Sequence, residues 1–177
     1  LEENRSNTTP QRVARDMAGE RTRYEDIVVG DDLGTVEWSF DEAAIARLCE
    51  SDDDFHEWYS VESPYGGVIA PVLINYPPVR ILFSRIYNVR GVFYCYEVEN
   101  YAPLKPNVKY TLSGRISDKW IKRDREYVQY EASCFGSDGT KIFFTRRTHA
   151  LDYLTLGVPK VATGIDSGAG GRLGDAR

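Results

Sequence analysis

Apolar residues recur at every second position over much of the second half of this chain, and this spacing constrains the fold more than any other feature. Side chains alternate between the two faces of a β-strand, so a period of two predicts strands with one buried face. The pattern covers three runs: Val92, Tyr94, Tyr96 and Val98; Tyr110, Leu112, Gly114 and Ile116; and Val128, Tyr130, Ala132 and Cys134. The tight-turn signal Ser137-Asp138-Gly139 precedes a fourth strand, predicted over 141–151. We expect these strands to form an antiparallel sheet.

The part of the chain before this sheet is predicted to add one strand and two helices. Residues 34–40 have a strand pattern, and Ser39 or Asp41 can cap a following helix that ends near Ser51. Residues 70–87 are strongly apolar, but prolines at 71, 77 and 78 do not fit one straight helix. We therefore expect a short first turn, a break, and a helix over about 78–87. The predicted class is α+β, a single domain with a curved antiparallel sheet wrapped around a central apolar helix.

Composition limits the classes of function. A length of 177 residues fits one folded domain, predicted over 24–156, between a flexible arm over 1–23 and a disordered tail over 157–177. The net charge of −5 argues against a nucleic-acid partner, and no apolar run is long enough to span a membrane. The three cysteines are far apart in the sequence, which predicts neither a disulfide framework nor a zinc site and favours the cytoplasm.

The densest group of titratable side chains lies at the end of the first predicted helix. Three consecutive acids, Asp52, Asp53 and Asp54, are followed closely by His56 and Tyr59. The segment Tyr65-Gly66-Gly67-Val68-Ile69-Ala70 comes next, with a glycine turn and an apolar run. Titratable groups beside an apolar wall are typical of a reaction centre, so we place the candidate site here.

Four segments resemble one known family in their order and spacing. They are Tyr24-Glu25-Asp26-Ile27-Val28-Val29-Gly30-Asp31, the segment 65–70, Tyr101-Ala102-Pro103-Leu104-Lys105-Pro106, and the final hairpin from Asp118 through Gly139 to Thr145-Arg146-Arg147-Thr148-His149. The layout resembles the hot-dog fold, and more narrowly the MaoC-like family of R-specific enoyl-CoA hydratases and dehydratases. The resemblance covers most of residues 24–151. It implies a hot-dog domain in which the sheet wraps the central helix.

The active loop of that family reads roughly S/T-G-D-x-N-P-hydrophobic-H. Against this pattern Asp54 matches the family's aspartate, while Tyr59 stands where the family has its catalytic histidine. His56 replaces the asparagine, Glu57 the proline, and Asp53 the small glycine before the aspartate. The aspartate is therefore kept and the histidine is not.

The chemistry implied by the resemblance needs a base for water, an acid for the α-carbon and a donor for an enolate-like oxygen. Asp54 is the candidate base, or else it belongs to a solvated acidic loop. His56 is a candidate for the second group because imidazoles titrate near neutrality, or else it is a surface histidine. Tyr59 is the other candidate for that group; it is alternatively a hydrogen-bond donor to the substrate or a packed tyrosine.

Substrate contacts are predicted for Trp58, Tyr65, Gly66, Gly67, Val68 and Ala70. Gly66 and Gly67 allow a thioester carbonyl to approach a main-chain N–H, or they simply form a loop. Further aromatic residues either line an acyl pocket or belong to the core: Tyr76, Phe83, Tyr94 and Tyr96. Basic residues of the second half either meet the phosphates of a carrier or form a solvated face: Lys105, Lys109, Lys119, Lys122, Arg123 and Arg125.

The expected function is that of an acyl-thioester hydratase or dehydratase, or a related addition–elimination enzyme. Its partner would be a coenzyme A or acyl-carrier-protein thioester. The alternative is a non-catalytic or half-site hot-dog subunit, paired with a chain that supplies the complete Asp and His pair. We expect no cofactor and no metal, because the sequence has no phosphate-binding loop, dinucleotide motif or metal-ligand spacing.

We predict that the purified chain forms a homodimer or a hetero-oligomer with another hot-dog subunit. A single sheet of this kind leaves one edge strand open, and pairing with a second chain satisfies its main-chain groups. Light scattering at micromolar concentration should give a mass above that of one chain, and a monomer mass would count against the prediction.

Overall fold

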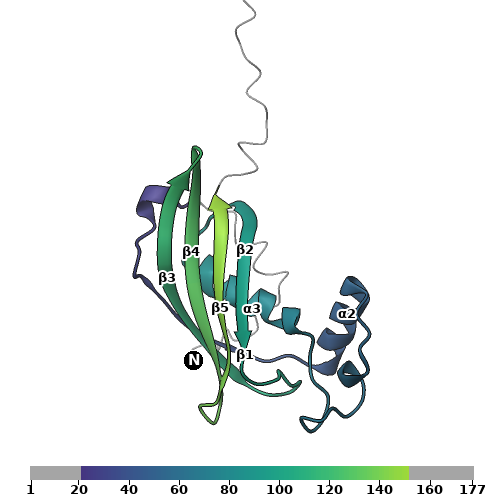
Figure 1. Cartoon of the computed structure of the whole chain (residues 1–177). Helices are drawn as coiled ribbons and strands as arrows, with labels where there is room; N and C mark the ends of the chain where they lie inside the picture. Colours follow the sequence, from purple (N-terminus) through teal and green to yellow (C-terminus); the bar gives the residue numbers. More distant parts are fainter. Residues whose placement is uncertain (1–20, 152–177) are drawn as a thin grey trace, which may run out of the picture.

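The structure, a computed structural model, describes residues 21–151 and contains one antiparallel sheet curved around a helix (Figure 1). The five strands lie in the order β1-β3-β4-β5-β2. The predicted α+β class and hot-dog arrangement are confirmed. The predicted arm, except for residues 21–23, and the predicted tail lie outside the described residues. The strands are β1 Asp32–Trp38, β2 Gly91–Asn100, β3 Tyr110–Lys122, β4 Arg125–Gly136 and β5 Lys141–Leu151.

Among the described residues, one short helical segment precedes β1 and four connect β1 to β2. They are η1 Tyr24–Asp26, α2 Glu42–Asp52, η2 Glu57–Tyr59, η3 Val72–Asn75 and α3 Tyr76–Ser84. Asp41 caps α2, since its side chain accepts a hydrogen bond from the Ala44 N–H at 2.8 Å. None of the described helices is long and apolar enough to cross a bilayer.

The central helix differs from its prediction because its prolines lie at its beginning. Pro77 and Pro78 occupy the first turn of α3, where a missing N–H leaves no hydrogen bond unmade. The 3₁₀ turn η3 therefore runs directly into α3, and the predicted break between them is absent. The two segments together form one helical run over 72–84 along the concave face of the sheet (Figure 1).

A glycine lets this helix approach the sheet closely. Leu82 and Phe83 of α3 are almost fully buried, and a Cβ atom on Gly114 of β3 would lie 2.9 Å from Leu82 Cδ2. The same Cβ would lie 2.3 Å from the Glu131 carbonyl oxygen on β4. Gly114 continues the inward face of β3 between Leu112 and Ile116, so its missing side chain leaves the space that Leu82 fills.

A buried arginine ties the start of α3 to the last strand. Arg147 of β5 is 0% exposed, and its Nη1 donates to the Tyr76 carbonyl oxygen at 2.9 Å. Its guanidinium lies 4.3 Å from the ring centre of Tyr76 and 4.7 Å from that of Tyr96, so two rings and one carbonyl replace part of its hydration shell, while its Nε and Nη2 atoms have no hydrogen-bond partner. The Tyr96 hydroxyl in turn donates to the Asn75 side-chain oxygen. These contacts fix the η3–α3 junction against β2 and β5.

His149 belongs to the same buried layer. Its ring stacks on Phe83 and contacts the Tyr130 hydroxyl at 3.2 Å. Burial, together with the nearby positive charges of Arg147 and Arg80, lowers the pKa of His149 to about 4. His149 is therefore neutral at physiological pH and acts as a packing residue within the sheet.

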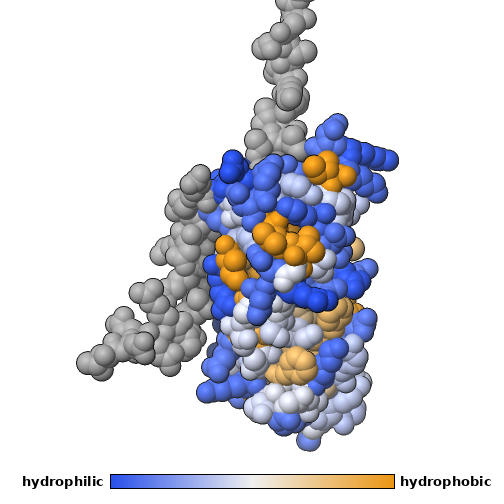
Figure 2. All heavy atoms as spheres, turned by 90° about the vertical axis from the view of Figure 1, so that its left-hand side faces the viewer, coloured by the Kyte–Doolittle hydropathy of each residue, from blue (hydrophilic) through white to orange (hydrophobic). Residues whose placement is uncertain are grey.

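The two edges of the sheet differ in length and exposure. β1 is short, and its pairing with β3 is irregular between Asp32 and Thr35. β2 is longer and carries the exposed residues Tyr94 and Cys95, with an irregularity in its pairing to β5 between Phe93 and Cys95. Figure 2 shows the side of the molecule nearest η1 and β3 as a mainly hydrophilic surface with small apolar areas. Val28 and Val29, which follow η1, are exposed.

Replacing Gly114 by alanine should destabilise the fold. The added Cβ collides with a backbone oxygen that cannot move far and with Leu82, and overpacking of this kind costs about 1–3 kcal/mol. Chemical denaturation should show this loss for Gly114→Ala and little change for Ser113→Ala, its neighbour on the opposite face of β3. Equal stability of the two variants would contradict the proposed close contact.

Candidate active site

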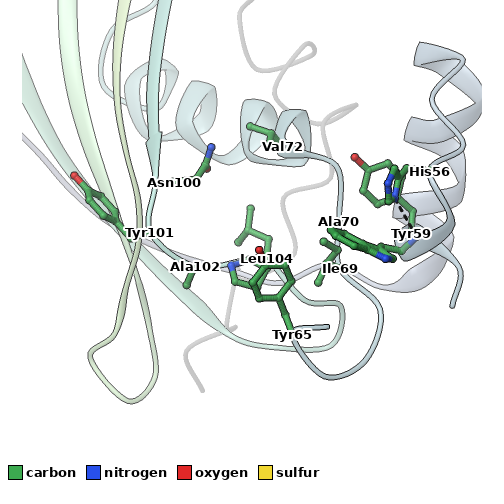
Figure 3. Close-up of a pocket in the computed structure, with 12 residues that line it drawn as sticks. His56, Tyr59, Tyr65, Ile69, Ala70, Val72, Asn100, Tyr101, Ala102 and Leu104 are labelled. Carbon is green, nitrogen blue, oxygen red and sulfur yellow. Dashed lines mark hydrogen bonds between the residues drawn. The ribbon is translucent and has the colours of Figure 1, made fainter. Parts of the chain in front are cut away.

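A cleft of about 390 Å³ opens at the start of the helical run (Figure 3). Four parts of the chain surround it: η2, the loop that follows η2, the beginning of η3, and the end of β2 with the turn after it. The lining residues are His56, Trp58, Tyr59, Tyr65, Ile69, Ala70, Val72, Asn100, Tyr101, Ala102, Pro103 and Leu104. The cleft therefore lies where the sequence places the densest group of titratable side chains.

The end of α2 places Asp54 beside this cleft. Asp53 adopts a left-handed conformation with φ of 52°, and its N–H and that of Asp54 both donate to the Cys49 carbonyl oxygen. This is a common way to end a helix, and the left-handed position usually holds glycine. Asp53 stands where the resembled family has its small glycine, and aspartate is one of the few other residues that tolerate this conformation. Asp54 then leaves the helix as an exposed side chain.

His56 caps the short helix η2 and is oriented by it. Its Nδ1 atom accepts a hydrogen bond from the Trp58 N–H at 3.2 Å. A neutral imidazole whose Nδ1 accepts must carry its proton on Nε2. His56 thus presents a hydrogen-bond donor, and its ring lies 4.8 Å from the ring centre of Trp58 and 5.6 Å from that of Tyr59.

Tyr59 lies next to Asp54. Burial raises the pKa of the Tyr59 hydroxyl, and the negative charge of Asp54 and a hydrogen bond with the Asp54 side chain raise it further. The hydroxyl is therefore protonated at neutral pH and acts as a donor. The structure brings together the two residues that match the aspartate and histidine positions of the resembled family.

The glycine turn has its own internal hydrogen bonds. The Gly66 N–H donates to the Ser63 carbonyl oxygen at 3.0 Å, and the Ser63 hydroxyl donates to the Gly67 carbonyl oxygen at 2.7 Å. Both glycines have left-handed φ angles, 75° and 83°, which the turn requires. Lys105 holds the turn from outside, since its Nζ donates to the Tyr65 carbonyl oxygen at 2.6 Å.

The structure places the predicted site residues in two groups. One group lines the cleft: His56, Trp58, Tyr59, Tyr65 and Ala70. Asp54, Gly66, Gly67 and Val68 are not among its lining residues. The predicted roles of all these residues in binding or catalysis stay predictions.

Sequence reasoning missed the wall of the cleft that follows β2. Ala102, Pro103 and Leu104 form this wall, and the Ala70 N–H donates to the Leu104 carbonyl oxygen at 2.8 Å. Asn100, the last residue of β2, faces the cleft from the same side (Figure 3). The sequence does predict a turn in segment 101–106, because it contains two prolines. It does not predict that this turn lies beside Ala70, because only the pairing of the strands brings the two segments together.

The start of η3 also contributes to the cleft. Val72 lines it, and Pro71 precedes the helix without a side-chain cap. The first N–H groups of a helix have no partner inside the helix, and Val72 is both a lining residue of the cleft and the first residue of η3.

A second hollow, of about 520 Å³, lies on the other side of the sheet. Its lining includes Ser113, Arg115, Glu131 and Ser133. Glu131 already pairs with Arg115 at 3.4 Å and with Arg146 at 2.9 Å. Within residues 21–151 there is no group of three His, Cys, Asp or Glu residues that could hold a metal ion. The cleft at η3 is therefore the stronger candidate site.

Comparisons with known proteins support the fold. No protein-family model matches the sequence, and no curated protein matches it. A monoamine oxidase regulatory protein from Archaeoglobus fulgidus shares the fold, with a TM-score of 0.64 and 14% identity over 76% of this chain and 97% of that one. An R-hydratase from Pseudomonas aeruginosa has a TM-score of 0.60 and 12% identity over 72% of this chain and 84% of that one.

A 3R-hydroxyacyl-ACP dehydratase complex from Mycobacterium tuberculosis also shares the fold. Its matching chain has a TM-score of 0.57 and 16% identity over 64% of this chain and 89% of that one. At these identities the likeness establishes a shared fold, which is that of hot-dog hydratases and dehydratases.

Removing the charge of Asp54 should lower the pKa of Tyr59. Asp54→Asn removes the negative charge and the carboxylate hydrogen bond that disfavour the phenolate, so the hydroxyl should titrate at lower pH. Carbon-13 NMR of ring-labelled tyrosine follows this titration, with Tyr59→Phe used to assign the signal. Asp52→Asn is the control and should leave the titration nearly unchanged; an equal shift in both variants would contradict the pairing of Asp54 with Tyr59.

Proposed function

We propose that this chain binds an acyl thioester in the cleft and acts in its hydration or dehydration. The observation that carries the proposal is the pairing of Asp54 with Tyr59 beside an apolar cleft at the start of the central helical run. The R-hydratase and the hydroxyacyl-ACP dehydratase that share the fold support this class of reaction. Coenzyme A and an acyl carrier protein are both candidate carriers of the acyl group.

In the proposed reaction the thioester carbonyl points to the start of η3. The N–H of Val72, at the first position of the helical run, binds its oxygen, which gains negative charge as the reaction proceeds. Asp54 removes a proton from water, and the water oxygen forms a bond to the β-carbon. Because Asp54 does not line the cleft, this water would lie at the edge of the cleft beside Tyr59.

The second proton transfer goes to the α-carbon. We assign it to His56 in its imidazolium form, which has taken a proton from water and whose Nδ1 then no longer accepts from the Trp58 N–H. The Nε2–H bond breaks as the C–H bond at the α-carbon forms, and Asp54 returns its proton to water afterwards. Tyr59 has a raised pKa, so it holds Asp54 and the water in place as a donor more readily than it gives up its own proton. Dehydration uses the same groups in the reverse order.

A second candidate function is that of a subunit whose partner chain carries out the catalysis. The raised pKa of Tyr59 favours it, because a phenol that stays protonated cannot replace a histidine that cycles its proton. The long edge strand β2 also offers a place for a second hot-dog chain to pair with the sheet. In this case the cleft would bind part of the substrate while the partner supplies an intact Asp and His pair.

Measuring the turnover of enoyl thioesters by single-residue variants distinguishes the catalytic function from the partner-subunit function. If this chain catalyses, Asp54→Asn should lower kcat by about two to four orders of magnitude, because the amide keeps the shape and removes the base. His56→Ala should lower kcat far more than it raises KM, since proton transfer is felt only in the transition state. Tyr59→His, which restores the family pattern, should raise weak hydratase activity.

The control for these variants is Asp52→Asn, which removes a neighbouring charge and should keep full activity. Full activity in Asp54→Asn would show that the proposed base is wrong. A wild-type chain that is inert on short, long and ring-bearing enoyl thioesters, but becomes active with a second hot-dog chain, would favour the partner-subunit function.

A further inference from the structure

The walls of the cleft limit which acyl group it can hold. We infer that the acyl group carries a ring close to the thioester, as an aryl-enoyl group does, in place of a long straight chain. This inference rests on the proposed function, because it names the class of acyl thioester that the same cleft would take.

The floor of the cleft is closed. Ala70 and Leu104 form it, they are only 8% and 5% exposed, and a main-chain hydrogen bond of 2.8 Å joins them. Beyond this floor lies the filled core between α3 and the sheet, where Leu82, Leu112 and Phe143 are each 0% exposed. A long acyl chain that continued past Ala70 and Leu104 would have to displace these fully buried side chains.

One wall of the cleft is a row of rings. The ring centres of Tyr59 and His56 are 5.6 Å apart, those of His56 and Trp58 are 4.8 Å apart, and those of Trp58 and Tyr65 are 6.1 Å apart. Trp58 and Tyr65 meet edge to face at 84°, so between them they offer both a ring face and a ring edge. Aromatic rings prefer such partners at centroid separations of about 4.5–7 Å.

The opposite wall is fixed and carries aliphatic side chains beside two others, Asn100 and Tyr101. Ala102 and Leu104 lie on this side of the cleft (Figure 3), and Pro103 between them also lines it. The Tyr101 and Ala102 N–H groups donate to the Ile142 carbonyl oxygen at 2.8 Å and 3.2 Å, which holds this segment to β5. A flat group between the two walls contacts rings on one side and aliphatic side chains on the other, and it loses little conformational freedom on binding.

The size of the cleft fits a compact group. A volume of about 390 Å³ lies near the lower end of the range for small-molecule pockets, about 300–1,000 Å³. The donors of His56 and of the start of η3 lie along the same cleft, so a ring joined directly to an enoyl thioester can fill the apolar part while its carbonyl meets those donors.

The inference is tested by binding measurements that do not depend on turnover. Isothermal titration calorimetry of the full chain compares 3-phenylpropanoyl-pantetheine with dodecanoyl-pantetheine, because these saturated thioesters bind without being hydrated. The ring-bearing thioester should bind about tenfold more tightly, which is the gain expected from one or two favourable ring contacts. Tyr65→Leu and Trp58→Leu keep apolar surface but remove a ring, and each should reduce this preference to within about threefold.

Trp120→Leu is the matched control, because Trp120 stacks on Tyr127 in the sheet and does not line the cleft. It should keep the full preference. Tyr65 is 56% exposed, so Tyr65→Leu remains folded even if Trp58→Leu does not. Equal or tighter binding of the dodecanoyl thioester, or an unchanged preference in Tyr65→Leu, would overturn the inference while leaving the proposed function standing. Absence of binding by both thioesters would overturn the proposed function as well.

Discussion

The contact between Leu82 and Gly114 sets the distance between the central helix and the sheet. Because Gly114 has no side chain, α3 lies close to β3, and Phe83 then stacks on Tyr130 with ring centres 4.4 Å apart. Arg147 holds the beginning of the same helix through the Tyr76 carbonyl oxygen. The helical run is thus held at Tyr76 and at Leu82, and its first turn, with Val72, lies at the mouth of the cleft. The site depends on this packing because the donors of η3 move with the helix.

Electrostatically the cleft is better equipped with donors than with bases. His56 presents Nε2–H because its Nδ1 is occupied, and Tyr59 stays protonated because burial and Asp54 raise its pKa. The start of η3 adds main-chain donors. Such a set suits a carbonyl oxygen that gains negative charge. The one nearby carboxylate, Asp54, lies next to Tyr59 and outside the lining of the cleft. The groups suited to binding a thioester carbonyl therefore line the cleft, whereas the candidate catalytic base lies outside its lining.

Much of the fold could be predicted from the sequence because it follows from periodicity. The alternation in residues 92–98, 110–116 and 128–134 marks three strands that the structure confirms as β2, β3 and β4. The break predicted before Pro78 was wrong, because prolines in a first turn cost no hydrogen bond. The wall formed by residues 102–104 could not be predicted, since it reaches Ala70 only through the pairing of β2 with β5. Local sequence patterns carry no information about such long-range neighbours.

The central claim, that an acyl thioester binds in the cleft at the start of η3, can be tested by NMR. Butyryl-pantetheine is saturated and cannot react, so it reports binding alone. On titration into the ¹⁵N-labelled chain, the account predicts that the largest amide shifts fall on Ile69, Val72 and Leu104. The amides of Ser113 and Ser133, at the hollow on the other side of the sheet, should stay in place. Shifts confined to Ser113 and Ser133, or no shifts at saturating ligand, would contradict the account.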